Sequence, residues 1–472
     1  MTSDLFGCVP GPRNGLADVP GLGVGHAECG GWPEGDGRAD QGSSGVTVIA
    51  TPAGAVAGVD VRGGGPGTRE TDLLSPWNTV EAVHAVVLAG GSAFGLDATS
   101  GAMAELEREG VGFPVLGAKE HPDKVVPIVP GAVIFDLLVG SWRERPGAEE
   151  GALATRRALR AAELELRAAG AGEAPGAAVG AEADQRSEDP GSNAGTRSSC
   201  IGAGRGATAG ALKGGFGQAS AVFPEGTALA GHVVAAAVVT NPQGSVFDPT
   251  TGLPWGIGSE MAGEFAVYEL SILGRRDEWG RVAPLNDAAI RRLVGCNIAG
   301  TKFPVPENGT GSASTSADPH GGPQTRSQGD STPTRPSPQS QCNTTIGIIA
   351  TTAPMTKAQA KRLAMAAHDG LARAVRPAHM PMDGDTFFAL SLPASGECET
   401  DGTQDDGKNR PKLDPASITP MQMTMLSAVA AQAVERAIVH SVLAAEPMFD
   451  VLSWSEIAEH VGGVDAGAEV QR

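Results

Sequence analysis

Thr344 begins an apolar run, TTIGIIATTA, directly after a long polar segment. That segment, 302–342, has too few apolar residues to offset the entropy lost on ordering, so we expect it to be a flexible connection. An apolar strand that begins abruptly at Asn343-Thr344 suggests a chain that is cut between these two residues. A Thr at a new amino terminus carries a hydroxyl nucleophile and an amine that can act as its base.

The chemistry of such a cut explains why the residue types matter. The amine of a chain terminus has a pKa of about 7.7–8.0, so a useful fraction is neutral near pH 7 and accepts the hydroxyl proton. The Thr344 hydroxyl would first attack the preceding carbonyl and shift Asn343 onto an ester that water releases. The dipeptide alone is weakly specific, because Asn78-Thr79 is a second such pair, within the helix-like segment PWNTVEAVH. A Thr that simply begins a strand is the alternative for Thr344.

Two carboxylates flank Gly384 in HMPMDGDTFFAL, at the predicted start of another strand. In a turn, Asp383 and Asp385 can face one side and orient an ammonium group or a Thr hydroxyl. An ordinary Asx turn is the alternative, and the further ligands of a calcium loop are missing. His379 precedes this turn and is the histidine that we single out, since the nine histidines show no metal-binding spacing.

The glycine-rich stretch GAGRGATAGALKGGFG, from Gly202 to Gly217, contains a single lysine, Lys213. Glycines let main-chain N–H groups converge on a developing oxyanion, and Lys213 would add positive charge there. The stretch does not match GxxxxGK[ST], so it is not a P-loop. The alternative is a glycine hinge with a solvated lysine. VRGGGPGTRE, near Gly63, matches neither nucleotide-binding template and is predicted to be a loop.

The elements that must position these residues alternate between strand and helix. Short β-branched runs ended by Gly or Pro indicate buried strands, and longer segments with one apolar face indicate helices. The predicted strands are GVTVIAT, AVAGVDVRGG, AVVLAGG, VPIVPGAVIFDL, HVVAAAVVTN, TTIGIIATTA and DTFFALSL. The predicted helices are SAFGLDATSGAMAELEREG, EEGALATRRALRAAELELRAAG, TKAQAKRLAMAAHDGLARA and the segment from Pro420 to about Ala445. This alternation predicts an α/β fold with helices covering sheet layers.

Three polar, low-complexity stretches interrupt the pattern, at 170–199, 302–342 and 395–411. The part that follows Asn343 contains only two clear strands and two clear helices, which suggests that it completes the core of the larger part. We therefore expect residues 1–343 and 344–472 to form one domain that is cut in two.

Composition argues against several functional classes. The net charge of −19 and the pI near 4.9 argue against a nucleic-acid-binding surface, which needs clustered basic residues. The six cysteines have no CxxC spacing, which favours reduced thiols in a cytoplasmic protein over disulfides or a zinc site. The first residues lack a signal-peptide pattern, and no run approaches the roughly 18 apolar residues of a membrane span. We expect no membrane partner, no cofactor and no metal ion.

Six segments, in order, resemble the self-processing peptidase family that includes L-aminopeptidase/D-esterase, the β-aminopeptidases and the nylon-oligomer endohydrolase. They are VDVRGGGPGTRETDLL, HAVVLAGGSAFGLDA, VPGAVIFDL, AVVTNPQG, CNTTIGIIAT and MDGDTFFAL. The resemblance spans nearly the whole chain outside the polar stretches. It implies a four-layer α/β/β/α sandwich like that of N-terminal-nucleophile hydrolases, with different strand connectivity. It also implies that the two processed chains stay associated, as a homo-oligomer and specifically a tetramer of processed units.

The resemblance also assigns roles to single residues. Thr344 matches the nucleophile, and Asp383 with Asp385 match the acidic pair beside it. Lys213 matches a lysine near the nucleophile of the nylon-oligomer enzyme, and Asn241 matches the asparagine that helps to stabilise the tetrahedral intermediate.

One position departs from the nylon-oligomer enzyme. Phe135, in VIFDL, stands where that enzyme has a Tyr, in VIYDF, so a hydroxyl contact in the substrate pocket is lost. This change argues against nylon-oligomer specificity.

Together these residues predict a self-cleaving, aminopeptidase-like hydrolase that acts on a small peptide or amino-amide substrate through an acyl-enzyme. Two alternatives stay open. One is an acyltransferase of the ornithine acetyltransferase type, in which an amine resolves the acyl-enzyme. The other is a non-catalytic assembly protein whose chain stays intact.

Overall fold

The computed structural model describes residues 5–29, 42–117, 121–170, 198–296, 343–392 and 418–462. The polar stretches predicted at 302–342 and 395–411 lie outside these residues, as does most of 170–199.

The described residues form strands, α-helices and short 3₁₀-helices. The strands are β1 (Gly23–Glu28), β2 (Gly45–Val61), β3 (Thr68–Arg69), β4 (Val83–Ala89), β5 (Phe113–Pro114), β6 (Val125–Val126), β7 (Gly131–Val133), β8 (Thr208–Ala209), β9 (Leu212–Lys213), β10 (Gly215–Val222), β11 (Val233–Thr240), β12 (Ile346–Thr351) and β13 (Thr386–Ser391). The α-helices are α1 (Ala98–Arg108), α2 (Ala148–Gly170), α4 (Ser271–Gly274), α5 (Asp287–Cys296), α6 (Lys357–Ala374), α7 (Pro420–Leu443) and α8 (Trp454–Gly462). The 3₁₀-helices include η4 (Ser92–Asp97), η6 (Gly202–Gly204), η7 (Trp255–Ser259) and η8 (Glu264–Tyr268).

One long strand, β2, belongs to two sheet layers. Its first half pairs antiparallel with β1 and β4, and β4 continues to β7 and β3. Its second half pairs with β13, from which the order runs through β12 and β11 to β10. The register shifts between Ala50 and Ala55, and Gly54 has a φ of 84°, so the strand bends there. The sequence predicted two separate strands at this place; the bend does not end the strand.

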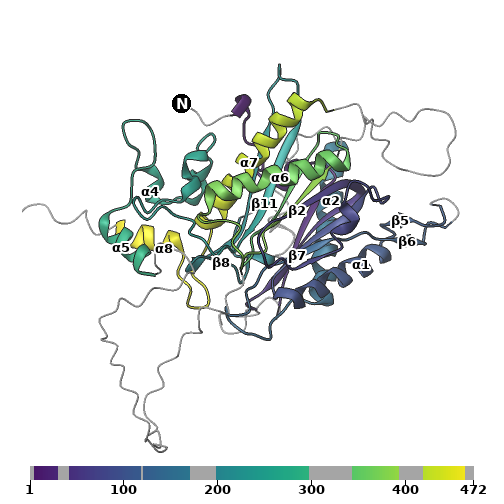
Figure 1. Cartoon of the computed structure of the whole chain (residues 1–472), viewed down its shortest axis with the longest axis horizontal. Helices are drawn as coiled ribbons and strands as arrows, with labels where there is room; N and C mark the ends of the chain where they lie inside the picture. Colours follow the sequence, from purple (N-terminus) through teal and green to yellow (C-terminus); the bar gives the residue numbers. More distant parts are fainter. Residues whose placement is uncertain are drawn as a thin grey trace, which may run out of the picture.

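Three apolar clusters separate four layers of structure. One cluster fills the space between the two sheet layers, and includes Ile49, Leu88 and Phe388. A second cluster packs α6 and α7 on the outer face of the β10–β13 layer, and a third packs α1 and α2 on the outer face of β2 and β4. Figure 1 shows these two helix pairs on opposite sides of the strands. The result is the predicted α/β/β/α sandwich.

Strand β12 shows why its sequence is apolar without alternation. Ile346, Ile348 and Ala350 point into the cluster between the sheets, whereas Ile349 points into the cluster under α6 and α7. Both faces of the strand are therefore buried, which is typical of a strand covered on two sides.

The two long carboxy-terminal helices begin where the sequence places them. Thr356 caps α6 and Thr419 caps α7, each in a capping box with a Gln three residues later.

Among the described residues, α7 is the one helix long and apolar enough to span a membrane, contrary to the expectation of no such run. In this fold 83% of that window is buried against β10, β11 and α6, so α7 is a core helix.

Two further predictions were wrong. The glycine-rich stretch is not the hinge with a solvated lysine that was its alternative, because Lys213 is fully buried and the last glycines begin β10, an eight-residue buried strand. Its glycines let α7 approach closely: a Cβ on Gly217 would lie 2.0 Å from the Ala437 carbonyl oxygen. The segment PWNTVEAVH, expected to be helical, forms no helix. Its residues 76–82 form turns, bends and irregular chain, and its last two residues, Val83 and His84, begin β4.

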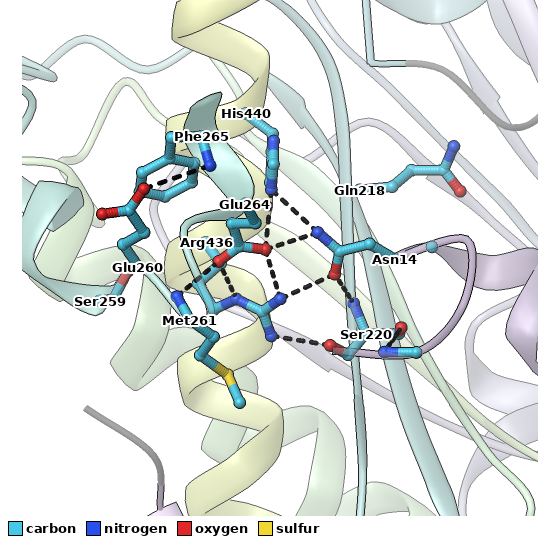
Figure 2. Close-up of polar contacts among 12 residues, drawn as sticks. Asn14, Gln218, Ser220, Ser259, Glu260, Met261, Glu264, Phe265, Arg436 and His440 are labelled. Atoms are coloured by element: carbon cyan, nitrogen blue, oxygen red, sulfur yellow. Dashed lines mark hydrogen bonds and ion pairs between the residues drawn. The ribbon is translucent and has the colours of Figure 1, made fainter. Parts of the chain in front are cut away.

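A buried ionic cluster fastens α7 to η8 and to the amino-terminal segment (Figure 2). The Arg436 side chain is fully buried and donates to both carboxylate oxygens of Glu264, to the Ser220 carbonyl at 2.8 Å and to Asn14 Oδ1 at 2.7 Å. His440 Nε2 lies 3.1 Å from Glu264 Oε2. We call these residues, with Tyr268 and Met261, the Glu264 cluster.

Candidate active site

The strand order brings the predicted site residues to one edge of a sheet layer. Strand β12 lies between β11, which is antiparallel to it, and β13, which is parallel to it. The end of β11 and the start of β13 therefore both meet the start of β12. Asn241, Thr344 and the Asp383–Asp385 turn are gathered for this reason.

The Asn343–Thr344 junction is buried, with exposed fractions of 2% and 4%. The Thr344 hydroxyl donates to the Asn343 carbonyl oxygen at 2.5 Å, and the Gly384 N–H donates to the same oxygen at 3.0 Å. The Thr344 N–H donates to the Asn241 carbonyl at 3.1 Å. The hydroxyl thus lies against the carbonyl that it would attack, and a main-chain donor already polarises that carbonyl.

Asp383 holds two loops together beside the junction. Its Oδ1 accepts the Gln243 N–H at 3.1 Å, and its Oδ2 accepts the Met380 N–H at 3.0 Å. The turn that follows β11 is therefore fixed to the turn that precedes β13. The carboxylate is fully buried, and its role in the intact chain includes this fastening.

Asp385 contacts Thr345, the residue that follows Thr344. Its Oδ1 accepts the Thr345 N–H at 2.9 Å, and its Oδ2 accepts from His379, through Nδ1 at 2.8 Å and the main-chain N–H at 3.1 Å. The aspartate pair therefore flanks the junction, and His379 is brought behind it.

Three consecutive glycines support the turn that carries the aspartates, and the sequence interpretation missed this role. Gly65 N–H donates to the Asp383 carbonyl at 2.9 Å. A Cβ on Gly63 would lie 2.4 Å from that same oxygen, and a Cβ on Gly64 would lie 2.3 Å from the Pro381 oxygen. Only glycine allows two main chains to approach this closely. The triplet GGG was the signal in the sequence.

Asn241 is held by both ends of its side-chain amide. Its Oδ1 accepts the Thr208 N–H at 2.9 Å, and its Nδ2 donates to the Phe135 carbonyl at 3.3 Å. The main chain of Phe135, the predicted pocket residue, is therefore linked to Thr344 by two hydrogen bonds, both of which are made by Asn241. The Phe135 side chain is half-buried. One N–H of Asn241 Nδ2 is left for another acceptor.

Lys213 is fully buried at the same sheet edge, just before β10, but its ammonium group faces the glycine-rich stretch. It donates to the carbonyls of Gly204 at 3.3 Å, Ala207 at 2.9 Å and Gly214 at 3.0 Å. Burial lowers the pKa of Lys213. Strand spacing places β10 roughly 10 Å from β12. In the intact chain the three N–H groups of the ammonium are taken by these carbonyls.

Asp136, next to Phe135, was not singled out from the sequence. Its Oδ1 accepts the Gly91 N–H at 2.7 Å, and its Oδ2 accepts the Ser44 hydroxyl at 2.7 Å. Burial raises its pKa to about 6 despite these hydrogen bonds. The carboxyl group fixes the segment from which the Phe135 carbonyl reaches Asn241.

The second Asn-Thr pair lies in a different environment. Thr79 is exposed, and Asn78 belongs to a surface turn in which its Nδ2 donates to the Asp72 carbonyl at 2.6 Å. The Asn78 carbonyl oxygen accepts from Lys357 Nζ at 2.8 Å. This pair shares the dipeptide of the Asn343–Thr344 junction without its burial at a sheet edge.

The described cysteines, Cys8, Cys29, Cys200 and Cys296, form no disulfide; Cys342 and Cys398 lie outside the described residues. Within the described ranges, no three His, Cys, Asp or Glu side chains are grouped so that they could hold a metal ion.

Sequence comparison relates the chain to peptidases over most of its length. The profile of peptidase family S58 matches residues 14–452. An uncharacterized aminopeptidase of Mycobacterium leprae is 39% identical over 445 residues, which cover 92% of this chain and 91% of that protein. A 6-aminohexanoate-oligomer endohydrolase of Kocuria sp. is 26% identical over 380 residues, which cover 79% of this chain and 74% of that protein.

Solved structures share the fold. A β-aminopeptidase of Burkholderia sp. has a TM-score of 0.55 at 20% identity, and the match covers 98% of this chain and 99% of that one. The L-aminopeptidase D-Ala-esterase/amidase of Ochrobactrum anthropi, described as a new variant among the Ntn hydrolase fold, has a TM-score of 0.52 at 21% identity, over 96% and 94%. The predicted fold class, an N-terminal-nucleophile-like sandwich of variant connectivity, is confirmed.

Proposed function

The chain belongs to peptidase family S58 and is an aminopeptidase-like hydrolase, and we propose that it cuts itself before Thr344 and then uses Thr344 as its nucleophile. The resemblance that the sequence motifs indicated is confirmed at the level of the family. Membership of a peptidase family favours hydrolysis over the acyltransferase and the non-catalytic alternatives.

One observation carries this proposal. The Thr344 hydroxyl lies 2.5 Å from the Asn343 carbonyl oxygen, and the same oxygen accepts the Gly384 N–H. The hydroxyl is thereby held next to the polarised carbonyl group whose carbon an intramolecular attack would target, and such proximity removes most of the entropic cost of the attack. Exposed Thr79 has no such arrangement among its described contacts.

Self-cleavage would take two steps. Thr344 Oγ1 attacks the Asn343 carbonyl carbon, the C–N bond breaks as the C–O bond forms, and the hydroxyl proton ends on the Thr344 nitrogen. Gly384 N–H stabilises the negative charge on the carbonyl oxygen during this shift. Water then hydrolyses the ester, which leaves a carboxylate on Asn343 and a free amine and hydroxyl on Thr344.

Turnover would reuse the same oxygen. Thr344 Oγ1 attacks a substrate amide carbonyl while the Thr344 amine takes its proton and passes it to the leaving amine. The N–H groups of Gly384 and Asn241 Nδ2 would receive the oxyanion. Water resolves the acyl-enzyme and restores the hydroxyl. Lys213 would support this site by holding the carbonyls of the loop that carries Thr208, which in turn positions Asn241.

The proposal is tested by a pair of matched variants, Thr344→Ala and Thr79→Ala. The purified wild type and Thr79→Ala are expected to give two chains by intact mass spectrometry and to hydrolyse aminoacyl p-nitroanilides. Thr344→Ala is expected to stay as one chain and to lose hydrolysis to the background rate. An uncut Thr344→Ala variant with full amidase activity would contradict the proposal.

The substrate class follows from the same assay. We propose a small peptide or amino-amide with a free amine, and the panel should contain L-, D- and β-aminoacyl p-nitroanilides with a 6-aminohexanoate oligomer. Hydrolysis of at least one aminoacyl amide, with weak or no action on the oligomer, is expected because Phe135 lacks the Tyr hydroxyl. Preference for the oligomer would overturn that part of the proposal.

A further inference from the structure

We call Asn241, Thr345, His379, Asp383 and Asp385 the polar shell around Thr344. Within it, His379 contacts Asp385. Its ring Nδ1 and its main-chain N–H both donate to Asp385 Oδ2, at 2.8 Å and 3.1 Å. Two donors from one residue hold one carboxylate oxygen, while Thr345 N–H holds the other at 2.9 Å. The backbone of His379 has a φ of 57°, an uncommon conformation for a residue with a side chain.

The other nitrogen of the His379 ring has no partner. His379 Nε2 is buried and accepts or donates no hydrogen bond, although a fifth of the whole side chain is exposed. Because a carboxylate oxygen only accepts, the 2.8 Å contact assigns a proton to Nδ1, directed at Asp385.

Other titratable groups, charged and neutral, surround the His379 ring. The His368 ring packs edge-on against it at 4.8 Å between centroids, and burial lowers the pKa of His368 to about 4, so His368 is neutral at pH 7. The groups that face His379, directly or behind His368, are Asp385, His368, Asp60, Arg62 and Lys361. The Asp60 charge is already matched by Lys361 and Arg62, so among the groups around His379 it is Asp385 whose field reaches Thr344, together with that of the neighbouring Asp383.

The distance from Asp385 to the nucleophile's nitrogen is short. Asp385 Oδ1 lies 2.9 Å from the Thr345 nitrogen. Consecutive residues of an extended chain advance by at most about 3.6 Å, so the Thr344 nitrogen lies within roughly 6.5 Å of Asp385. At such a distance a carboxylate favours the protonated form of an amine and weakens it as a base.

We infer that His379 is a positioning residue for catalysis, which holds Asp385 and offsets its negative charge so that the Thr344 amine stays a competent base near neutral pH. The inference rests on the proposed function of Thr344. The role exists only after the cut, because before the cut the Thr344 nitrogen belongs to an amide. His379 therefore acts on turnover and not on self-cleavage.

Two substitutions isolate this role, His379→Gly and His379→Asn. Both residues accept a φ of 57°, so neither strains the backbone as Ala would. Asn keeps an N–H donor near the position of Nδ1, whereas Gly removes the donor. In His379→Gly, Asp385 keeps its two main-chain donors but loses the ring donor, so its charge should raise the pKa of the Thr344 amine.

The readout is the pH profile of kcat/KM for an aminoacyl p-nitroanilide, measured on the processed enzyme. In His379→Gly the acid limb is expected to move up by about 0.5–1 pH unit, with a loss of about threefold to tenfold at pH 7 and recovery toward the wild-type rate at high pH. In His379→Asn the limb should stay within about 0.3 pH unit of wild type. All three proteins should cut themselves at similar rates.

His440→Asn is the matched control, because His440 also contacts a buried carboxylate, Glu264, but lies in the Glu264 cluster. It is expected to lower the melting temperature and to leave the acid limb in place. The inference is overturned if the His379→Gly limb does not move, if His379→Asn moves it equally, if His440→Asn moves it too, or if either His379 variant stays uncut. An uncut wild type, in contrast, overturns the proposed function itself.

Discussion

The Glu264 cluster and the polar shell around Thr344 are both buried, but their hydrogen bonds are completed to different degrees. Every side-chain nitrogen and oxygen of Glu264, Arg436 and His440 has a partner. Near Thr344, Thr345 Oγ1 and His379 Nε2 have none, nor does Nδ1 of His368, whose ring packs against that of His379. Unpaired buried polar atoms cost free energy and are uncommon, so their occurrence in this connected set of residues indicates a function other than holding the fold.

The two regions also differ in the groups that their carboxylates contact. Burial alone would raise the pKa of Glu264, but Arg436 and His440 outweigh it and lower the pKa to about 2. The cluster is therefore a matched ion pair that ties α7 to η8. Around Thr344, Asp383 accepts two main-chain N–H groups, and Asp385 accepts two main-chain N–H groups and the His379 ring. The difference predicts that the first region sets stability and the second sets activity.

Gly384→Ala should have the largest effect on activity. A Cβ there would lie 2.5 Å from the Gly65 oxygen and 2.8 Å from Thr344 Oγ1, so the turn must move away from the junction. This movement displaces the Gly384 N–H, which donates to the Asn343 carbonyl, and should therefore slow self-cleavage by about 100-fold or more. Gly258→Ala is the control, because a Cβ at Gly258 would meet nothing within 4 Å. The half-life of the uncut chain measures the effect, and equal half-lives would contradict the account of the site.

Arg436→Met should have the largest effect on stability. It leaves Glu264 buried without its main cation, which should cost about 3–5 kcal/mol of unfolding free energy. Chemical denaturation measures this cost, and the folded fraction should still cut itself. Adding Glu264→Gln to Arg436→Met should recover part of the loss. A stable Arg436→Met protein that no longer cuts itself would break the distinction between the two regions.

Acid unfolding should isolate the Glu264 contribution. The pKa of Glu264 is about 2 in the folded protein against 4.5 for an ordinary glutamate, so its stabilisation is present above pH 4.5 and is lost as the pH falls toward 2. This contribution amounts to about 3 kcal/mol. Glu264→Gln should be less stable than wild type at pH 7, and that difference should shrink toward pH 2. A constant difference across this range would show that the ion pair is not the cause.

Phe135→Tyr should have the smallest effect. Phe135 contacts the shell through its main-chain carbonyl, which accepts from Asn241, so a new side-chain hydroxyl leaves that contact in place. Stability should change by less than about 0.5 kcal/mol and self-cleavage should be unchanged. The ratio of 6-aminohexanoate-oligomer to aminoacyl-amide hydrolysis should rise. A large loss of self-cleavage would mean that the side chain, and not the main chain, supports the site.

The sequence predicted the local parts of this molecule better than the contacts among them. Short patterns of apolar, capping and turn residues predict the start of β12 just after Asn343-Thr344, the caps of α6 and α7 and the carboxylates beside Gly384. The bend that keeps β2 one strand does not follow, because Gly54 and the preceding Pro look like the end of a strand. The difference arises because both halves of β2 find partner strands in separate layers.

Site contacts that depend on the meeting of distant segments were also missed. The Gly63–Gly65 triplet is the predicted loop, but its contact with the Asp383 turn was missed because that turn lies more than 300 residues away. Lys213 was expected to face an oxyanion, yet its ammonium group takes three carbonyls of its own segment. The choice between these arrangements depends on burial and on local carbonyl geometry, which a linear pattern does not contain.

The central claim is that the chain cuts itself between Asn343 and Thr344. Intact mass spectrometry of the purified wild-type protein, with sequencing of the smaller chain, tests it most directly. The account predicts two chains, 1–343 and 344–472, the second beginning Thr-Thr-Ile-Gly, and a single chain from Thr344→Ala. A wild-type protein that remains one chain of 47.6 kDa after prolonged incubation, or that is cut elsewhere, would contradict it.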